Sequence, residues 1–261
     1  MVRAGLPALT VAAGFILLAG CGEESPSGLA QAGDPLALHA TTVLDPSICL
    51  PSRGGFTIQS TNRYFPLHAG NQWFYRGEEE GETLELLITV LDRNRVIEGV
   101  TTRVLEEREW VDDELLEVSW NYYVEAAEGT VCYYGEDVDI FEEEEIVHDG
   151  AWCADEPRNA PGIIMPAKPR RGLKYVNEIA PGIAEDEATI VRSEPVTVPA
   201  GHFTETIRIR EFNPLDGDVG FKVFALGTGL VIDGPAELIR FTRNADEPEG
   251  PIPTDQTCGR L

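Results

Sequence analysis

The chain is poor in basic residues and almost devoid of lysine. It carries 45 acidic residues against 20 basic ones, which gives a net charge of −25. Nucleic acid and anionic lipid surfaces are therefore poor partners, because both bind through positive surfaces. An acidic surface of this kind is typical of highly soluble proteins, of salt-adapted proteins and of proteins that bind divalent cations.

The sequence also lacks the local patterns of catalysis. His148 and His202 lie in no His-x-x-x-His metal pattern, and Ser119 and Ser193 have no nucleophile-elbow context. With so many carboxylates, chance pairing is expected, so glycosidase chemistry gains no support. We therefore expect a protein that is not an enzyme, with an enzyme of unknown class as the third hypothesis.

Long apolar runs are absent except near the N-terminus. Ala8–Gly20 is apolar, small or hydroxylic, and too short to cross a ~30 Å hydrocarbon core as a helix. Small residues at Ala19 and Gly20 give a peptidase access to the bond before Cys21. The thiol of Cys21 is the one nucleophile there that can carry a thioether-linked lipid. This block resembles the bacterial lipobox.

That resemblance implies that residues 1–20 are a signal peptide and that Cys21 carries lipid such as palmitate. Each buried methylene contributes about 0.8 kcal/mol, so two or more chains anchor the protein stably in a membrane. Gly22 is not an acidic retention residue, so the resemblance favours the outer membrane. We expect a periplasmic or surface-exposed domain held there by its lipid.

The folded part is expected to begin after a tether. Residues 21–50, which start at the lipidated cysteine, are rich in Gly, Ala, Ser and Pro and lack periodicity. Residues 51–245 then form the domain, and residues 246–261 form a C-terminal tail.

Four cysteines remain once Cys21 carries lipid. An even number in an oxidising compartment predicts two disulfides, with three possible connectivities. Strands at Thr130–Phe141 and Glu144–Cys153, joined by a two-residue turn at Glu142–Glu143, place Cys132 opposite Cys153. Cys49 and Cys258 then join the two ends of the domain.

The same register makes other cross-strand pairs. It places Tyr133 opposite Trp152, Asp137 opposite His148, and Glu136 opposite Asp149. The first two pairs are favourable, whereas two carboxylates facing each other are destabilising unless something offsets their charge.

The domain contains an internal repeat with an offset of 102 residues. Gly70–Trp73 matches Gly172–Tyr175, and the match continues as far as Arg108–Glu109 against Arg210–Glu211. Repeat 1 covers residues 64–131, a hairpin and crossover cover 132–169, and repeat 2 covers 170–242.

Alternating β-branched, aromatic and leucine residues predict strands throughout both repeats. The strands are expected at Glu85–Leu91, Thr102–Trp110, Leu116–Val124, Ala188–Val191, Glu205–Phe212 and Phe221–Ala225. No convincing helical stripe competes with them. The fold class is therefore all-β and antiparallel, with two related meanders that form a curved sheet, half-barrel or barrel-like domain.

Several blocks resemble a known group of proteins. Tyr64–Leu67, Gly70–Trp73, Pro161–Ala167, Val198–Phe203 and Gly227–Val231 are similar to blocks of uncharacterised bacterial secreted proteins and lipoproteins grouped as TapB-like. The resemblance covers about residues 64–235. It implies an extracytoplasmic location and brings no known activity.

Acidic clusters raise the hypothesis of a calcium site. Hard cations require several carboxylate or carbonyl oxygens. Glu136, Asp137 and Asp149 are close in the predicted hairpin, and Glu185 and Asp186 could join them through the fold. No segment matches an EF-hand, so a solvated acidic turn is the alternative.

Aromatic residues raise the hypothesis of an apolar ligand. A curved antiparallel sheet has a concave face that can hold a lipid or a peptide. Trp73, Trp110, Trp120, Tyr122 and Phe224 are the candidates for that face, with core packing as the alternative.

The sequence thus predicts a lipid-anchored extracytoplasmic protein that binds or scaffolds an unknown lipid, peptide or protein partner. A calcium-binding module is the alternative, and no other cofactor is expected.

Overall fold

The computed structural model describes residues 42–142, 145–256 and 258–259. In these ranges the chain is all-β, apart from two short 3₁₀ helices, η1 (Pro46–Cys49) and η2 (Pro51–Arg53). None of the helices in the described ranges is long and apolar enough to cross a membrane. The predicted signal peptide, the lipidation site Cys21 and the tether as far as residue 41 lie outside the described residues.

Strands make up most of the fold. In chain order they are β1 (Thr42–Val43), β2 (Gln72–Glu79), β3 (Glu82–Ile97), β4 (Val100–Val111), β5 (Glu114–Glu125), β6 (Val131–Glu142), β7 (Glu145–Val147), β8 (Trp152–Cys153), β9 (Gly162–Met165), β10 (Leu173–Val176), β11 (Glu187–Arg192), β12 (Val196–Val198), β13 (Gly201–Phe203), β14 (Thr206–Phe212), β15 (Val219–Ala225), β16 (Gly229–Asp233) and β17 (Ala236–Thr242). The predicted strands lie within or largely overlap these elements.

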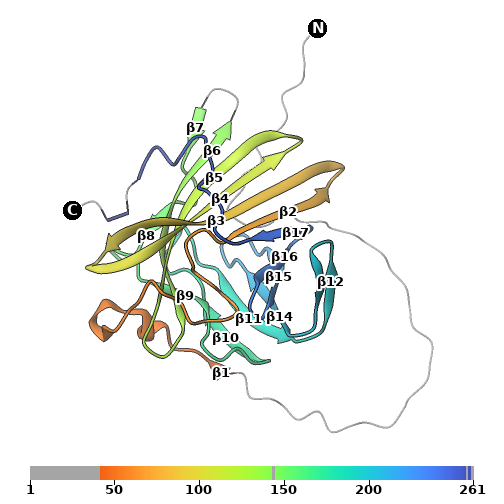
Figure 1. Ribbon diagram of the computed structural model, residues 1–261. Coiled ribbons are helices and arrows are strands. Elements are labelled where there is room, and N and C mark those ends of the chain that lie inside the picture. The colour runs from red at the N-terminus through yellow and green to blue at the C-terminus, as the bar shows by residue number, and fades with distance from the viewer. Residues whose placement is uncertain (1–41, 143–144, 257, 260–261) are drawn as a thin grey trace, which may run out of the picture.

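Fifteen of these strands form one sheet that curves without closing into a barrel. Its order is β1-β10-β11-β14-β15-β16-β17-β2-β3-β4-β5-β6-β7, with β8 and β9 also paired to β6, while β12 and β13 form a separate hairpin. The long strands β2 to β6 form one wall, and β10, β11, β14 and β15 lie beneath them in Figure 1. The predicted all-β curved sheet is confirmed.

The two walls have the same plan. Strands β2 to β6 form one antiparallel meander, and β10, β11, β14, β15 and β16 form another. Leu87 pairs with Arg108 on β3 and β4, and Thr189 pairs with Arg210 on β11 and β14. Each residue of the second pair follows its counterpart in the first pair by 102 residues, which is the offset of the repeat. The two walls therefore share this register.

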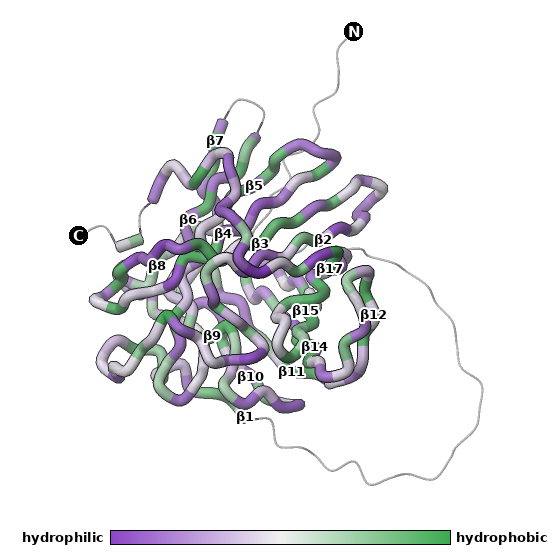
Figure 2. The backbone as a smooth tube through the Cα atoms, viewed as in Figure 1, coloured by the Kyte–Doolittle hydropathy of each residue, from purple (hydrophilic) through white to green (hydrophobic). Residues whose placement is uncertain are grey.

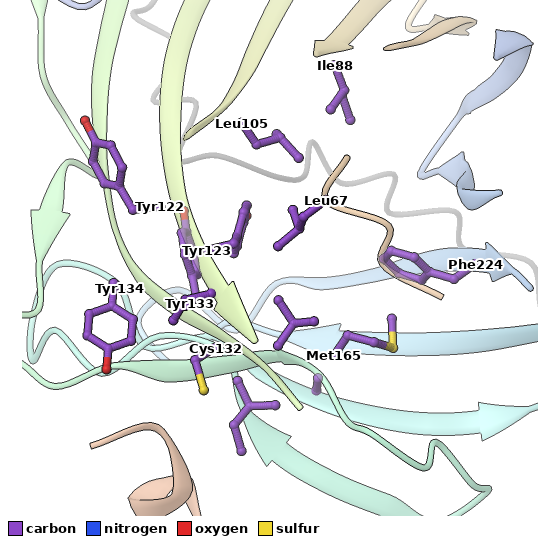
Figure 3. Packing of buried hydrophobic residues seen from close by; sticks show 14 of the residues in the cluster. Leu67, Ile88, Leu105, Tyr122, Tyr123, Cys132, Tyr133, Tyr134, Met165 and Phe224 are labelled. Carbon is purple, nitrogen blue, oxygen red and sulfur yellow. The ribbon is translucent and has the colours of Figure 1, made fainter. Parts of the chain in front are cut away.

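Side chains alternate between the two faces of each long strand. Hydrophilic and hydrophobic positions follow one another along the strands in Figure 2. Tyr122 and Tyr123 are neighbours on β5 but point to opposite sides of the strand, and Tyr123 joins Leu67, Leu105 and Phe224 inside the curved sheet (Figure 3). The apolar core therefore includes side chains from the inner face of the sheet.

The predicted tether ends earlier than expected. β1 pairs in parallel with β10, and Leu44 N donates to Lys174 O at 2.8 Å. Cys49 is fully buried. Residues 42–50 are thus part of the folded domain, because η1 inserts Cys49 against the sheet.

The four cysteines form two disulfides, but the predicted pairing was wrong. Cys49 is bonded to Cys132, and Cys153 is bonded to Cys258. The predicted bonds were Cys132–Cys153 and Cys49–Cys258.

The error comes from the register around β6. Phe141 pairs with Ile146, whereas the predicted turn pairs it with Glu144, so the partner of each residue in this part of β6 is shifted by two residues. The returning chain then breaks after β7 and pairs again as β8, where Cys153 lies opposite Gly135. Cys132 instead faces Ile163 of β9, a segment predicted as part of a crossover.

The C-terminal tail is not a free end. Glu247 accepts from the guanidinium of Arg93 at 2.9 Å, and the carbonyl of Pro251 accepts from Arg108 at 2.9 Å. Thr254 N donates to Asp139 at 2.9 Å, and Cys258 is joined to Cys153. The tail therefore covers the outer face of β3 to β6.

Peptide mapping of the unreduced protein should recover Cys49–Cys132 and Cys153–Cys258, whose Cα atoms are 5.6 and 5.3 Å apart. Replacing Cys49 and Cys132 together by serine should lower the free energy of unfolding by about 2–5 kcal/mol, because the bond closes a long loop in the unfolded chain. A peptide that joins Cys132 to Cys153 would contradict the structure.

Candidate functional site

The curved sheet encloses a cavity of about 400 Å³ between its two walls. This volume is in the range of small-molecule sites. Its lining is dominated by acidic side chains from both walls. They are Glu79, Glu107, Glu109, Glu117, Glu136, Glu178, Asp186, Glu211 and Asp233. The basic residues of the lining are Arg208 and Lys222.

Strand alternation explains why acidic residues face inward. On β4, Glu107 and Glu109 line the cavity, whereas Glu106 and Arg108 point to the outer face. The outward pair is joined, with Arg108 Nε donating to Glu106 Oε1 at 2.7 Å. The inward carboxyls of β4 have no such arginine, so β4 has a neutralised outer face and an acidic inner one.

Lys222 is the cation at the centre of the second wall. Its Nζ lies 3.5 Å from Glu211 Oε2 and 3.7 Å from Asp233 Oδ2. Burial lowers the pKa of Lys222, but the carboxylates of Asp233, Glu211 and Glu107 outweigh it and hold that pKa well above the usual value. Lys222 therefore stays protonated and offsets part of the negative charge.

The first wall contains a carboxyl without a partner. Glu117 is 6% exposed and makes no hydrogen bond or ion pair with another residue of the described ranges. Burial, with the nearby Glu109 and Glu107, raises the pKa of Glu117 to about 8. Burial also raises the pKa of Glu107 and of Glu109 to about 7. These three groups repel one another whenever they ionise.

The second wall also carries carboxyls with raised pKa values, although it contains Lys222. Burial and the charges of Asp186 and Glu211 raise the pKa of Glu178 to about 8. Burial and Glu211 raise the pKa of Asp186 to about 6. Glu136 lies between the walls, and burial, Glu178 and Glu117 raise its pKa.

A buried amide adds an acceptor to the second wall. Asn177 is 4% exposed and lines the cavity, and its Nδ2 donates to Glu211 Oε1 at 3.2 Å. Its Oδ1 has no hydrogen-bond partner in the structure. A buried acceptor of this kind costs free energy until a donor reaches it.

One end of the cavity is apolar. A smaller volume of about 70 Å³ is lined by Phe65, Trp73, Ile88 and Phe224 among others. It shares five lining residues with the acidic cavity, so the two adjoin; the shared residues are Glu107, Tyr123, Ile164, Lys222 and Asp233.

The other end reaches the surface. Phe221, Gly234 and Pro235 line the cavity and are exposed. Gly234 and Pro235 form the turn between β16 and β17, so the opening lies beside this turn.

The residues predicted for a calcium site do not come together. Glu136 and Asp186 line the cavity, but Asp137 lies on the opposite face, where its carboxylate is hydrogen-bonded to Tyr122. Asp149 is in an exposed turn, and Glu185 accepts from Gly182 N at 2.7 Å. The described part of the chain contains no group of three or more His, Cys, Asp or Glu residues that could hold a metal ion.

The predicted hairpin contacts are also revised. Glu136 pairs with Trp152, not with Asp149. His148 Nδ1 lies 3.0 Å from Asp139 Oδ1, not beside Asp137, because the register is shifted. The rings of Tyr133 and Trp152 do meet, at 5.2 Å between centroids, although Tyr133 pairs with Gly162.

The predicted aromatic face is divided between two sides of the sheet. Trp73 and Phe224 line the apolar end, and Trp73 Nε1 donates to Thr228 O at 2.7 Å. Trp120 donates to Glu106 at 2.9 Å on the outer face, where Tyr122 also lies. Trp110 is half-buried near the β4–β5 turn.

Sequence reasoning missed most of the acidic lining. Glu107, Glu109 and Glu117 occur at alternate positions of strands that were predicted correctly, and this alternation was the available signal. Asn177 and Lys222 gave no local signal, because only the curvature of the sheet brings them opposite β4 and β5.

Comparison of the chain with protein-family models, with curated proteins and with solved structures finds no match.

The raised pKa values predict the pH dependence of stability. Glu117 titrates near 4.5 when unfolded and near 8 when folded, so between these values the folded state holds a proton that the unfolded state has released. Stability should therefore fall from pH 5 to pH 8, by up to about 1.4 kcal/mol per pH unit for each such group.

Thermal unfolding at several pH values, compared between the native chain and Glu117→Gln, measures this slope. The variant should be more stable than the native chain at pH 8 and should show a shallower loss. Glu128→Gln, at an exposed position, should leave the slope unchanged. Equal slopes for Glu117→Gln and the native chain would contradict the assignment.

Proposed function

We propose that this protein is a lipid-anchored extracytoplasmic binding protein that holds a small ligand between the two walls of its curved sheet. The observation that carries this proposal is the cavity of about 400 Å³, whose wall holds the unpaired carboxyl of Glu117 and the unpaired Oδ1 of Asn177. Groups that only stabilised the fold would be paired with one another, as Glu106 and Arg108 are on the outer face.

The location rests on the N-terminal sequence and on the cysteines. Cys21 follows a lipobox-like block, and Gly22 favours transport to the outer membrane. Two disulfides agree with an oxidising compartment outside the cytoplasm. The domain then faces the periplasm or the outside, and the lipid replaces any need for a membrane-spanning segment.

The proposed role is binding without chemistry. His148 lies on the outer face with Asp139, and His202 lies in the β12–β13 hairpin, 2.8 Å from Thr197 Oγ1. Neither histidine lines the cavity. The lining offers acceptors and charge, which orient a ligand, and the proposed activity ends with its capture and release.

Lipidation is tested by growing the source bacterium or an expression host with labelled palmitate. The native chain should carry the label and sediment with outer membranes, because Cys21 is the acylated residue. Cys21→Ser should lose both label and sedimentation. Gly22→Asp should keep the label but move to the inner membrane. Label retained by Cys21→Ser would contradict the anchor.

Ligand binding is tested with the full chain in mild detergent by native mass spectrometry. The native chain should carry or take up a small molecule that denaturation releases. Ser119→Phe should exclude it, because Ser119 is buried in the cavity wall and a benzyl group there fills the space. Thr101→Phe, at an exposed position of β4, is the control. Equal loading of both variants would contradict binding in this cavity.

A further inference from the structure

We propose that the ligand of this cavity is an organic polyamine, a small flexible molecule with two or more protonated amines separated by methylenes. This inference rests on the proposed binding function and names the chemistry that the cavity recognises.

The two repeats place different side chains at one matched position of the cavity wall. Glu109 and Glu211 are equivalent in the repeat, and both line the cavity, one from each wall. On β14 and β15, Ile209 pairs with Lys222. The equivalent of Ile209 is Glu107, which pairs with Ser119. One wall therefore has a lysine where the other has a serine.

Burial raises the pKa of Glu107 and the charge of Lys222 across the cavity lowers it, but the first wall contributes no basic residue of its own to the lining. Lys222 lies within 4 Å of Glu211 and Asp233, whereas Glu117, on the first wall, makes no ion pair. A ligand ammonium beside Glu107, Glu109 and Glu117 would do for this wall what Lys222 does for the other. Ammonium and carboxylate form charge-assisted hydrogen bonds, which are the strongest available here.

The second wall requires a second positive group. Glu178 and Asp186 line the cavity together with Glu211 and Asp233, so the carboxyls of this wall outnumber its lysine. The buried Oδ1 of Asn177 also lacks a donor, and an ammonium supplies three. The acidic groups thus lie on facing walls, and a ligand with amines at both ends satisfies them together.

A metal ion does not fit this arrangement. A hard cation needs several oxygens within about 2.6 Å of one point. In the ranges that the structure describes, no three acidic or other ligating residues converge in this way. Carboxyls that are spread around a cavity suit separated charges on one molecule. The adjoining apolar end, with Trp73 and Phe224, accommodates the methylenes.

Isothermal titration of the full chain in detergent tests the proposal with a triamine (spermidine), a diamine (putrescine), a monoamine (butylamine) and calcium chloride. Affinity should fall from triamine to diamine to monoamine, and calcium should not compete. Glu117→Gln and Glu136→Gln should each weaken the triamine by about tenfold or more. Glu128→Gln is the matched control and should bind as the native chain does.

A variant that binds the triamine more tightly distinguishes specific recognition from a loss of binding caused by misfolding. Lys222→Met removes the built-in cation and frees Glu211 and Asp233, so the triamine should bind more tightly to it than to the native chain. Weaker binding by this variant while it stays folded would overturn the assignment.

Other outcomes distinguish this inference from the binding function. If amines do not bind but the chain takes up a lipid that Ser119→Phe excludes, the polyamine is overturned and the binding function stands. Tighter binding of a lysine-rich peptide or of calcium overturns the polyamine in the same way. If the native chain and Ser119→Phe are equally empty with every probe, both proposals fail.

Discussion

Acidic side chains occur on both faces of β4 and β6, and the rest of the structure depends on how each face accommodates them. On the outer face, Asp137 lies beside Arg95 and accepts from Tyr122, and Asp139 lies beside His148. The tail adds backbone donors, Thr254 N to Asp139 and Cys258 N to Asp137. The Cys153–Cys258 bond holds this part of the tail in place, so Asp137 and Asp139 each accept a hydrogen bond from it.

The carboxyls of the inner face outnumber the basic residues beside them. Its carboxyls have Lys222 and Arg208 as the basic residues of their lining, and burial raises the pKa of several of them toward neutrality. A fold selected for stability alone would place apolar side chains there, because a well-packed apolar interior is at least as stable as buried charge. The unneutralised inner face lowers stability, and binding of the proposed polyamine would offset that loss.

The sequence predicted what depends on local pattern. Alternation located β3 to β6, and the offset between Arg108 and Arg210 anticipated the matching register of the two walls. The predicted register was wrong where one strand pairs with several strands in succession. β6 pairs with β7, β8 and β9, so a register extended from the turn at Glu142 misplaced both Cys153 and His148. The acidic lining was missed for a related reason: whether Glu117 faces water or a cavity depends on curvature, which a period of two does not encode.

The repeat also explains how one cavity can be acidic on two sides and still asymmetric. Each of the two similar meanders carries an inward glutamate, Glu109 on one wall and Glu211 on the other, so their charges add. Lysine at position 222, where the first wall has Ser119, offsets part of the charge of the second wall. A lysine on each wall would remove the field that attracts a cation, and a lysine on neither wall would leave nine carboxyls with Arg208 as the one basic residue of the lining. A single lysine thus reduces the destabilising repulsion between carboxyls and leaves the cavity with net negative charge.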